Sequence, residues 1–249
     1  MNFLLLEPSE VACAGDCAIR GRRVEHMRTV LQAEVGTRLR VGVINGRLGS
    51  ATVTSLAVDT ATLSIELHEQ PAPVRDTLLL AVPRPKVLMR MLSHAAALGF
   101  ARIVLFRSWR VDKTWMQSRA FDPDVQREQL VLGLEQAGRT QLPEVLRFDL
   151  FKPMVEDELP RLELPQPRFV AHPYAATPTH QLGALGHAAS TERPAFTLAI
   201  GPDGGFLPYE VDKLIEAGFH AISCGAHPLR TETALAALWG QLDLLRYRR

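Results

Sequence analysis

Three segments of the sequence place glycine, proline and a few polar residues directly after apolar, strand-like runs. They are Val170-Ala-His-Pro173, Ile200-Gly-Pro-Asp-Gly-Gly-Phe206 and Cys224-Gly-Ala-His-Pro-Leu-Arg-Thr-Glu-Thr233. In open α/β sheets, ligands bind outside the carboxyl ends of the strands, and glycine there lets backbone groups approach a flat ligand closely. The three segments therefore predict one ligand site at one edge of a sheet, formed largely by backbone.

Other chemistries find little support in the residue spacing. The 200–206 segment matches neither the dinucleotide-binding nor the P-loop glycine pattern, and Ser108 and Ser223 lack the context of a hydrolase nucleophile. A tight turn before a helix starting at Pro208 explains the glycines of this segment about as well as a ligand does. The eight histidines are scattered singly, so no metal site is predicted.

The elements that must position these segments follow from hydrophobic periodicity. From Leu78 onward, apolar runs alternate with helical patterns, which predicts an α/β domain with a parallel sheet covered by helices. The predicted strands are residues 78–82, 102–106, 144–149, 168–172, 196–200 and 220–224. The predicted helices are residues 85–98, 123–136, 152–162, 179–189, 208–217 and 231–246.

The first 70 residues have a different pattern. Strand-like runs at 38–44, 49–56 and 61–67, with turn residues between them and one helix at 25–33, predict a small, mostly antiparallel β-barrel. The proline-bearing polar stretch 70–76 is typical of a linker. We therefore predict two domains, residues 1–72 and 73–249.

Composition sets the broad class. The 249 residues are 47% hydrophobic and 22% charged, which is typical of a soluble globular protein. No apolar run approaches the roughly 20 residues of a membrane span, and no basic segment precedes the apolar run at 3–6. Cys13, Cys17 and Cys224 have neither redox-pair nor zinc spacing, so we interpret them as reduced thiols of a cytoplasmic protein.

Positive charge is concentrated near the N-terminus although the net charge is only +1. Between residues 20 and 50 the chain has seven arginines against two glutamates. Arginine suits phosphates and base edges because its guanidinium group is a planar fork of donors. A general replacement of lysine by arginine explains the total arginine content equally well, but it explains the cluster less well.

Several motifs in order resemble one known family. They are His26 to Gly36, Pro85-Lys86 with a helix ending at Leu98-Gly99, Glu135-Gln-Ala-Gly-Arg139, Ile200 to Phe206 and Leu229-Arg-Thr-Glu-Thr-Ala234. Together they resemble the 16S ribosomal RNA uracil-N3 methyltransferases of the SPOUT superfamily along nearly the whole chain. Four positions depart from the family pattern: Gln32, Ala137, Asp203 and the pair His227-Pro228.

The resemblance implies a PUA-like β-barrel followed by a trefoil-knotted α/β domain that binds S-adenosylmethionine and acts as a homodimer. It implies methylation of uridine N3 in 16S ribosomal RNA, free or within the assembled small ribosomal subunit, with no metal and no membrane. Two alternatives stay open: methylation of another RNA, and an RNA-binding relative without catalysis.

The resemblance also implies roles for individual residues. An arginine aimed at the uracil carbonyls would stabilise the developing imide anion, and the candidate catalytic residues are Arg139, Arg230 and Glu232. Arg139 and Glu232 also have structural interpretations, as a helix end and a helix first turn. The candidate cofactor-binding residues are Ala171, His172, Pro173, Ile200, Gly201, Pro202, Gly204, Gly205, Cys224, Gly225, Leu229, Arg230 and Thr231. The candidate RNA-binding residues are Arg20, Arg22, Arg23, His26, Arg28, Lys86 and Arg110.

Overall fold

The computed structural model describes residues 3–11, 15–185 and 193–247, and the chain divides into two compact units. The first unit consists of Met1–Pro73 and Val131–Leu142, and the second of Val74–Leu130 and Pro143–Arg249. The sequence predicts a single boundary near residue 72. The structure adds a second, discontinuous segment to the first unit.

Hydrogen bonds explain why this distant segment belongs to the first unit. The carbonyl of Thr140 accepts the N–H of Asn45 at 2.8 Å, and the Thr140 hydroxyl donates to the Gly46 carbonyl at 2.9 Å. The Asn45 side chain in turn accepts the N–H of Leu142 at 2.9 Å. The Asn45-Gly46 turn is therefore a docking point for a segment almost 100 positions away, which no local pattern indicates.

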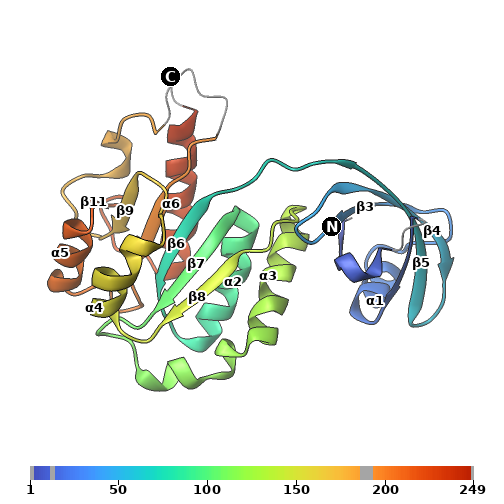
Figure 1. The fold of residues 1–249 in the computed structure, drawn as a ribbon, viewed down its shortest axis with the longest axis horizontal. Coiled ribbons are helices and arrows are strands. Elements are labelled where there is room, and N and C mark those ends of the chain that lie inside the picture. The colour runs from blue at the N-terminus through green and yellow to red at the C-terminus, as the bar shows by residue number, and fades with distance from the viewer. Residues whose placement is uncertain (1–2, 12–14, 186–192, 248–249) are drawn as a thin grey trace. The chain divides into compact units, whose positions relative to one another are not determined.

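The first unit is built on a five-stranded sheet in the order β1-β3-β4-β5-β2 (Figure 1). The β1–β3 pair is parallel and the other ladders are antiparallel. No ladder joins β1 to β2 among the described residues, so closure into a barrel remains a prediction. The elements are β1 (Phe3–Leu6), β2 (Asp16–Arg20), α1 (Arg22–Thr29), β3 (Arg38–Val43), β4 (Leu48–Leu56) and β5 (Thr60–Glu69).

Helix α1 lies three to four residues earlier than the periodicity predicts. Gly21 adopts φ +67°, and its carbonyl accepts the N–H groups of Val24 and Glu25, so the helix starts there. Beyond the other end of the helix, Gln32 adopts φ +49°, which turns the chain away from the helical path. The predicted helix 25–33 is wrong at both ends because these two backbone conformations, and not the apolar spacing, set the limits.

The second unit contains a six-stranded, wholly parallel sheet in the order β11-β9-β10-β6-β7-β8 (Figure 1). This confirms the predicted parallel sheet. The strands are β6 (Asp76–Ala81), β7 (Phe100–Phe106), β8 (Glu144–Phe148), β9 (Arg168–Ala171), β10 (Thr197–Ile200) and β11 (Phe219–Ile222).

Helices cover both faces of this sheet. Leu79 and Ala81 of β6 pack in one core with α4 and α5, while α2 and α6 pack against each other on the other face. Successive side chains along each strand point to opposite faces of the sheet, so the strands contribute apolar side chains to the core on each face. The helices are α2 (Pro85–Leu98), α3 (Pro123–Ala137), α4 (Phe151–Pro153), α5 (Pro208–Glu216) and α6 (Thr231–Arg246).

Two predicted helices differ from the structure. The region 152–162 continues from α4 through a π-helical turn, Met154–Glu158, into a 3-10 turn, Leu159–Arg161, because Pro160 has no N–H to donate. The predicted helix 179–189 is only a 3-10 turn, Thr179–Gln181, followed by non-helical chain, and residues 186–189 lie outside the described residues. Thr179 bonds to the Ser223 carbonyl through both its N–H, at 2.9 Å, and its hydroxyl, at 2.8 Å, which draws it toward the sheet.

A buried ion pair fixes the C-terminal end of α6 to the sheet. Asp76, at the start of β6 and 1% exposed, accepts a hydrogen bond from Arg246 at 2.6 Å. The Arg246 guanidinium also lies 4.3 Å from the centre of the Phe196 ring. Burial raises the pKa of Asp76, an effect that Arg246 and Arg193 oppose. This anchor holds the helix whose other end reaches the ligand site.

Candidate functional site

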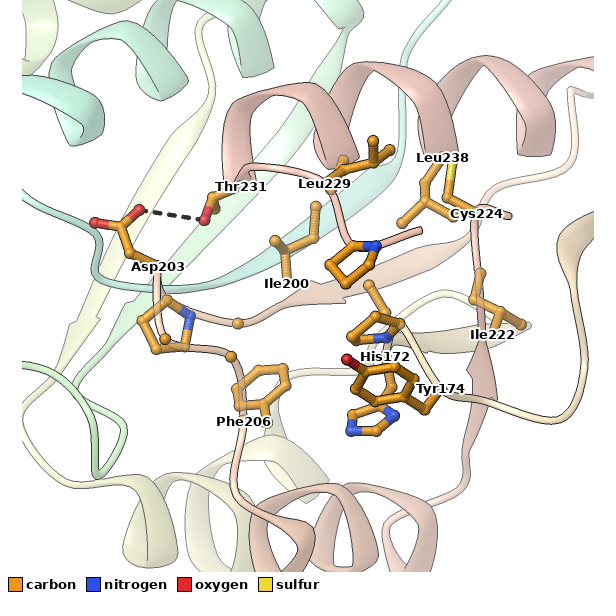
Figure 2. Close-up of a pocket in the computed structure, with 18 of the residues that line it drawn as sticks. His172, Tyr174, Ile200, Asp203, Phe206, Ile222, Cys224, Leu229, Thr231 and Leu238 are labelled. Atoms are coloured by element: carbon orange, nitrogen blue, oxygen red, sulfur yellow. Dashed lines mark hydrogen bonds between the residues drawn. The ribbon is translucent and has the colours of Figure 1, made fainter. Parts of the chain in front are cut away.

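The loops that follow β9, β10 and β11 surround one pocket of about 380 Å³ (Figure 2). These three strands are neighbours in the parallel sheet, so their carboxyl ends meet at the same edge. This arrangement confirms that the three segments meet at one edge of the sheet, and their role as a ligand site stays a prediction. Of the predicted cofactor-binding residues, the pocket is lined by Ala171, His172, Pro173, Ile200, Gly201, Pro202, Gly204, Gly205, Cys224, Leu229 and Thr231.

The glycine-rich loop turns tightly against itself. The N–H of Gly205 donates to the Pro202 carbonyl at 2.8 Å, and Gly205 adopts φ +71°. A Cβ atom at Gly201 would lie 3.1 Å from the backbone nitrogen of Phe206. The Phe206 ring stacks on Phe106 with centroids 6.2 Å apart, so this wall of the pocket has little room to move. A side chain at 201 would therefore fit only if the neighbouring backbone shifted by a few tenths of an ångström.

Apolar side chains make up much of the remaining wall, and several were not predicted. Leu229 and Leu238 lie across the pocket from Phe206 and Tyr174 (Figure 2). Thr231, Ala234 and Leu238 share a face of α6 at helical spacing, which is the signal that predicts their common contact. The additional lining residues are Arg110, Tyr174, Asp203, Phe206, Ile222, His227, Pro228, Ala234 and Leu238.

Few ionisable groups face the pocket. Asp203 lies 3.5 Å from the Arg84 guanidinium and accepts a long hydrogen bond from the Thr231 hydroxyl at 3.5 Å. Arg110 donates to the Gly204 carbonyl and so lies along the glycine loop. The His172 ring meets Tyr174 edge-on at 6.0 Å. This environment suits an aromatic ligand held by backbone groups and a few polar contacts.

Cys224 is a half-buried thiol in the wall of the same pocket. Burial raises its pKa, and the Gln241 amide, which donates to the Cys224 carbonyl at 3.3 Å, opposes the rise. Cys17 is buried in the first unit, where burial and the nearby Glu10 raise its pKa to about 11. Both are free thiols, as predicted, and Cys13 lies outside the described residues.

Gly225, Arg230 and Glu232 are not among the residues that line the pocket. Arg230 is exposed at the N-terminal cap of α6, and Glu232, in the first turn of the helix, is ion-paired with Arg90 of α2. The Arg90 guanidinium lowers the pKa of Glu232, which makes the carboxylate a weaker base. The ion pair supports the structural interpretation of Glu232 as a residue of the helix first turn, and its part in removing a substrate proton stays a prediction.

Arg139 lies in the first unit, directly after α3. The N–H of Gly138 donates to the Glu135 carbonyl at 3.4 Å, and the N–H of Arg139 to the Leu134 carbonyl at 3.0 Å. With Gly138 at φ +65°, this is a Schellman helix end. The backbone thus accounts for the cap without the Arg139 side chain, which is half-buried.

The basic N-terminal residues have unequal surroundings. Arg23 is tied to both carboxylate oxygens of Glu10 and to the Leu5 carbonyl, which gives it a structural role, and its phosphate contact stays a prediction. Arg22 pairs with Glu135 at 3.0 Å, yet half of its side chain is exposed. Arg28, whose guanidinium donates to the Val58 carbonyl, and Arg20 are exposed on the same segment, while His26 is partly buried. Lys86 is exposed in the first turn of α2, in the second unit.

Within the described residues, no three His, Cys, Asp or Glu side chains lie close enough together to hold a metal ion. Among the helices of that same part of the chain, none has the length and apolar character needed to cross a membrane.

Residues 70–243, most of the chain, match the family model of the RNA methyltransferase domain, so the protein belongs to this family. More particularly, it is 29% identical to Ribosomal RNA small subunit methyltransferase E of Treponema pallidum (strain Nichols). That alignment covers 95% of this chain and 88% of the relative.

Solved structures share the fold. The Ribosomal RNA small subunit methyltransferase E from Neisseria gonorrhoeae, bound to S-adenosyl methionine, superimposes with a TM-score of 0.73 at 22% identity, covering 97% of each chain. A putative methyltransferase from Legionella pneumophila, in complex with the same cofactor, gives a TM-score of 0.72 at 23% identity, covering 98% of this chain and 96% of that one. The agreement extends over both units of the chain.

Proposed function

We propose that this protein transfers a methyl group from S-adenosylmethionine to N3 of a uridine in 16S ribosomal RNA. The observation that carries the proposal is the pocket formed by the loops after β9, β10 and β11 in a chain of the RNA methyltransferase domain family. The named relative from Treponema pallidum supports the ribosomal substrate. In this proposal the five-stranded unit is a PUA-like barrel and the second unit contains a trefoil knot.

The pocket fits the cofactor. Its volume of about 380 Å³ lies within the range of small-molecule sites, and Ile200, Leu229 and Leu238 supply apolar surface for an adenine ring. Glycine at 201 keeps this tight loop free of a side chain, so that its backbone groups can lie close to the ligand. When bound, S-adenosylmethionine supplies an activated methyl group on a sulfonium centre. Positioning should therefore contribute most of the rate.

Residues of this chain would stabilise the charge that develops on the base. As N3 loses its proton, negative charge spreads onto the two ring carbonyls, and a guanidinium aimed at them lowers the barrier. We assign this role to Arg139, supplied by the partner subunit of a homodimer, with Arg230 as the second candidate. Glu232 is left out of the chemistry because of its ion pair with Arg90.

The RNA must present the base unpaired, because pairing hides N3 on the Watson–Crick edge. The exposed Arg20, Arg22 and Arg28 would contact phosphates of 16S ribosomal RNA or of the assembled small subunit, in the cytoplasm. The test is to incubate the purified protein and S-adenosylmethionine with small subunits from a strain lacking the gene. Mass mapping should find one new 3-methyluridine in 16S ribosomal RNA. If no new 3-methyluridine forms, the proposed function is refuted.

S-adenosylmethionine is expected to protect Cys224 from alkylation. Because burial raises its pKa, iodoacetamide should modify Cys224 slowly at neutral pH and faster as the pH rises toward that pKa. Peptide mass spectrometry with and without the cofactor measures the protection. Cys17 is the internal control, since a thiol that is 2% exposed should stay unmodified in both samples. Equal modification of Cys224 in both samples would place the cofactor elsewhere.

Replacing Arg22 and Arg28 together with alanine is expected to weaken RNA binding and flatten its salt dependence. Each lost phosphate contact removes about one unit of slope, so the change should reach up to about two. Filter binding of transcribed 16S ribosomal RNA across a salt series measures it. Arg161→Ala, which removes an exposed arginine of the second unit, is the control. An unchanged slope in the double variant would show that these arginines face only solvent.

A further inference from the structure

A second cavity, of about 710 Å³, lies at the same edge of the parallel sheet as the cofactor pocket. It is formed by the segments that follow β7 and β8 and by the start of α5. The two sites share a wall, because Phe206 lines the cofactor pocket and the next residue, Leu207, lines the second cavity. Likewise, Arg110 lines the cofactor pocket and the preceding residue, Trp109, lines the second cavity. We call this second site the Trp109 cavity.

Large apolar side chains are exposed around the Trp109 cavity. Trp109 is 82% exposed, Leu150 53% and Tyr209 49%. Clustered exposure of this kind usually marks a binding surface, since these side chains would otherwise be buried. Two aromatic rings at the rim of a cavity are also suited to stacking on a flat partner.

The charge around the cavity is positive. Arg107, Lys113 and Lys152 line it, and Glu210 is the one carboxylate among the lining residues. Both oxygens of Glu210 are already occupied, by the N–H groups of Trp109 and Leu207, each at 2.9 Å. Lys152 lies 3.9 Å from Glu156, but Arg107 and Lys113 have no carboxylate partner among the described residues. The cavity thus offers cations for an anion.

Two further contacts shape the floor. The Arg107 Nε donates to the Asp149 carbonyl at 2.9 Å, which holds this guanidinium at the end of β8. Ser108 lines the cavity, and its buried hydroxyl has no hydrogen-bond partner in the part of the chain that the structure describes. A polar edge that reaches the floor would supply the missing bond.

We propose that the Trp109 cavity binds one nucleotide of single-stranded RNA, next to the nucleotide that is methylated. Exposed aromatic rings for the base, cations for the phosphate and a shared wall with the cofactor pocket together match this occupant. The inference rests on the proposed RNA methyltransferase function and adds a subsite to it. The base stacks on Trp109 and Tyr209, and Lys113 and Lys152 contact the phosphate.

The test measures binding of labelled oligouridylate to the intact protein. Trp109→Ala should raise the Kd by about ten- to a hundredfold, because stacking of one base contributes about 1–3 kcal/mol. Trp109→Phe keeps an aromatic face and should stay within a few-fold of wild type. Lys152→Ala should reduce the salt slope, whereas Arg161→Ala, an exposed cation also paired with a glutamate, should not. Thermal unfolding verifies that each variant is folded.

Unchanged oligouridylate affinity in a folded Trp109→Ala variant would overturn the inference. So would a change of mass in sedimentation with unchanged RNA affinity, because it would identify a second copy of the chain as the occupant. Calorimetric titration of the wild type with S-adenosylmethionine is run separately. A failure there would refute the proposed methyltransferase function and leave the RNA-binding result to be judged on its own.

Discussion

Arg139→Ala is expected to lower the single-turnover rate of methyl transfer by about a hundredfold or more, with S-adenosylmethionine affinity nearly unchanged. A guanidinium that meets the uracil carbonyls only as charge develops contributes to the transition state and not to cofactor binding. Rapid-quench assays give the rate and calorimetry gives the affinity. The cap at the end of α3 should survive, since it uses the backbone of Gly138 and Arg139 and not the side chain.

Arg139→Lys is the matched control, because it keeps the charge but loses the planar fork, and its rate should fall between those of wild type and Arg139→Ala. If Arg139 acts across a dimer interface, mixing Arg139→Ala and Gly201→Val protomers should restore part of the activity. One site of each heterodimer then has an intact pocket and an intact arginine. Labelled chains must first show that subunits exchange. Exchange without recovery would place Arg139 in the site of its own chain, and an unchanged rate in Arg139→Ala would remove it from catalysis.

Gly201→Val is expected to raise the Kd for S-adenosylmethionine by about a hundredfold or more. Even a Cβ atom at this position would press on the Phe206 nitrogen at 3.1 Å, and the valine methyl groups would crowd this loop further and displace it from the pocket wall. Phe206 is held by its stacking on Phe106, so the glycine-rich loop at 201–205 must move to relieve the close contact. Isothermal titration measures the affinity, and circular dichroism checks that the fold is kept.

Gly183→Val is the control for this substitution. A Cβ atom at Gly183 meets nothing within 4 Å, so valine there should leave cofactor affinity at the wild-type value. Gly201→Ala should give an intermediate loss, because the neighbouring backbone must shift only by tenths of an ångström. If a folded Gly201→Val protein binds the cofactor as tightly as wild type, the ligand site is not in this pocket.

Local patterns predicted the second unit well because its signals are local. Helix α2 has the predicted bounds, with Pro85 in its first turn and Gly99 at φ +88° after its end. The loops after β9, β10 and β11 were recognisable because apolar strands end there in glycine and proline. The convergence of these loops follows from the parallel sheet, so most of the pocket wall was predictable from the sequence.

Contacts between distant residues were not predictable. Glu10 pairs with Arg23, one arginine of a cluster that looks uniform in sequence, and Arg90 pairs with Glu232, a proposed base. Both depend on side chains that the fold brings together, and charge counting contains no such information. The Trp109 cavity was missed for a similar reason, since its lining comes from three separate segments with no shared motif.

Helix α3 begins in the second unit and ends in the first, so the chain passes between the units three times. The first unit is therefore discontinuous in the gene. A truncation after residue 73 would discard Thr140 and leave the Asn45-Gly46 turn without its partner. A single recombination event cannot transplant this unit intact either. A substitution in the α3 C-terminal turn therefore changes the first unit, even though it lies between the two stretches of sequence that encode the second.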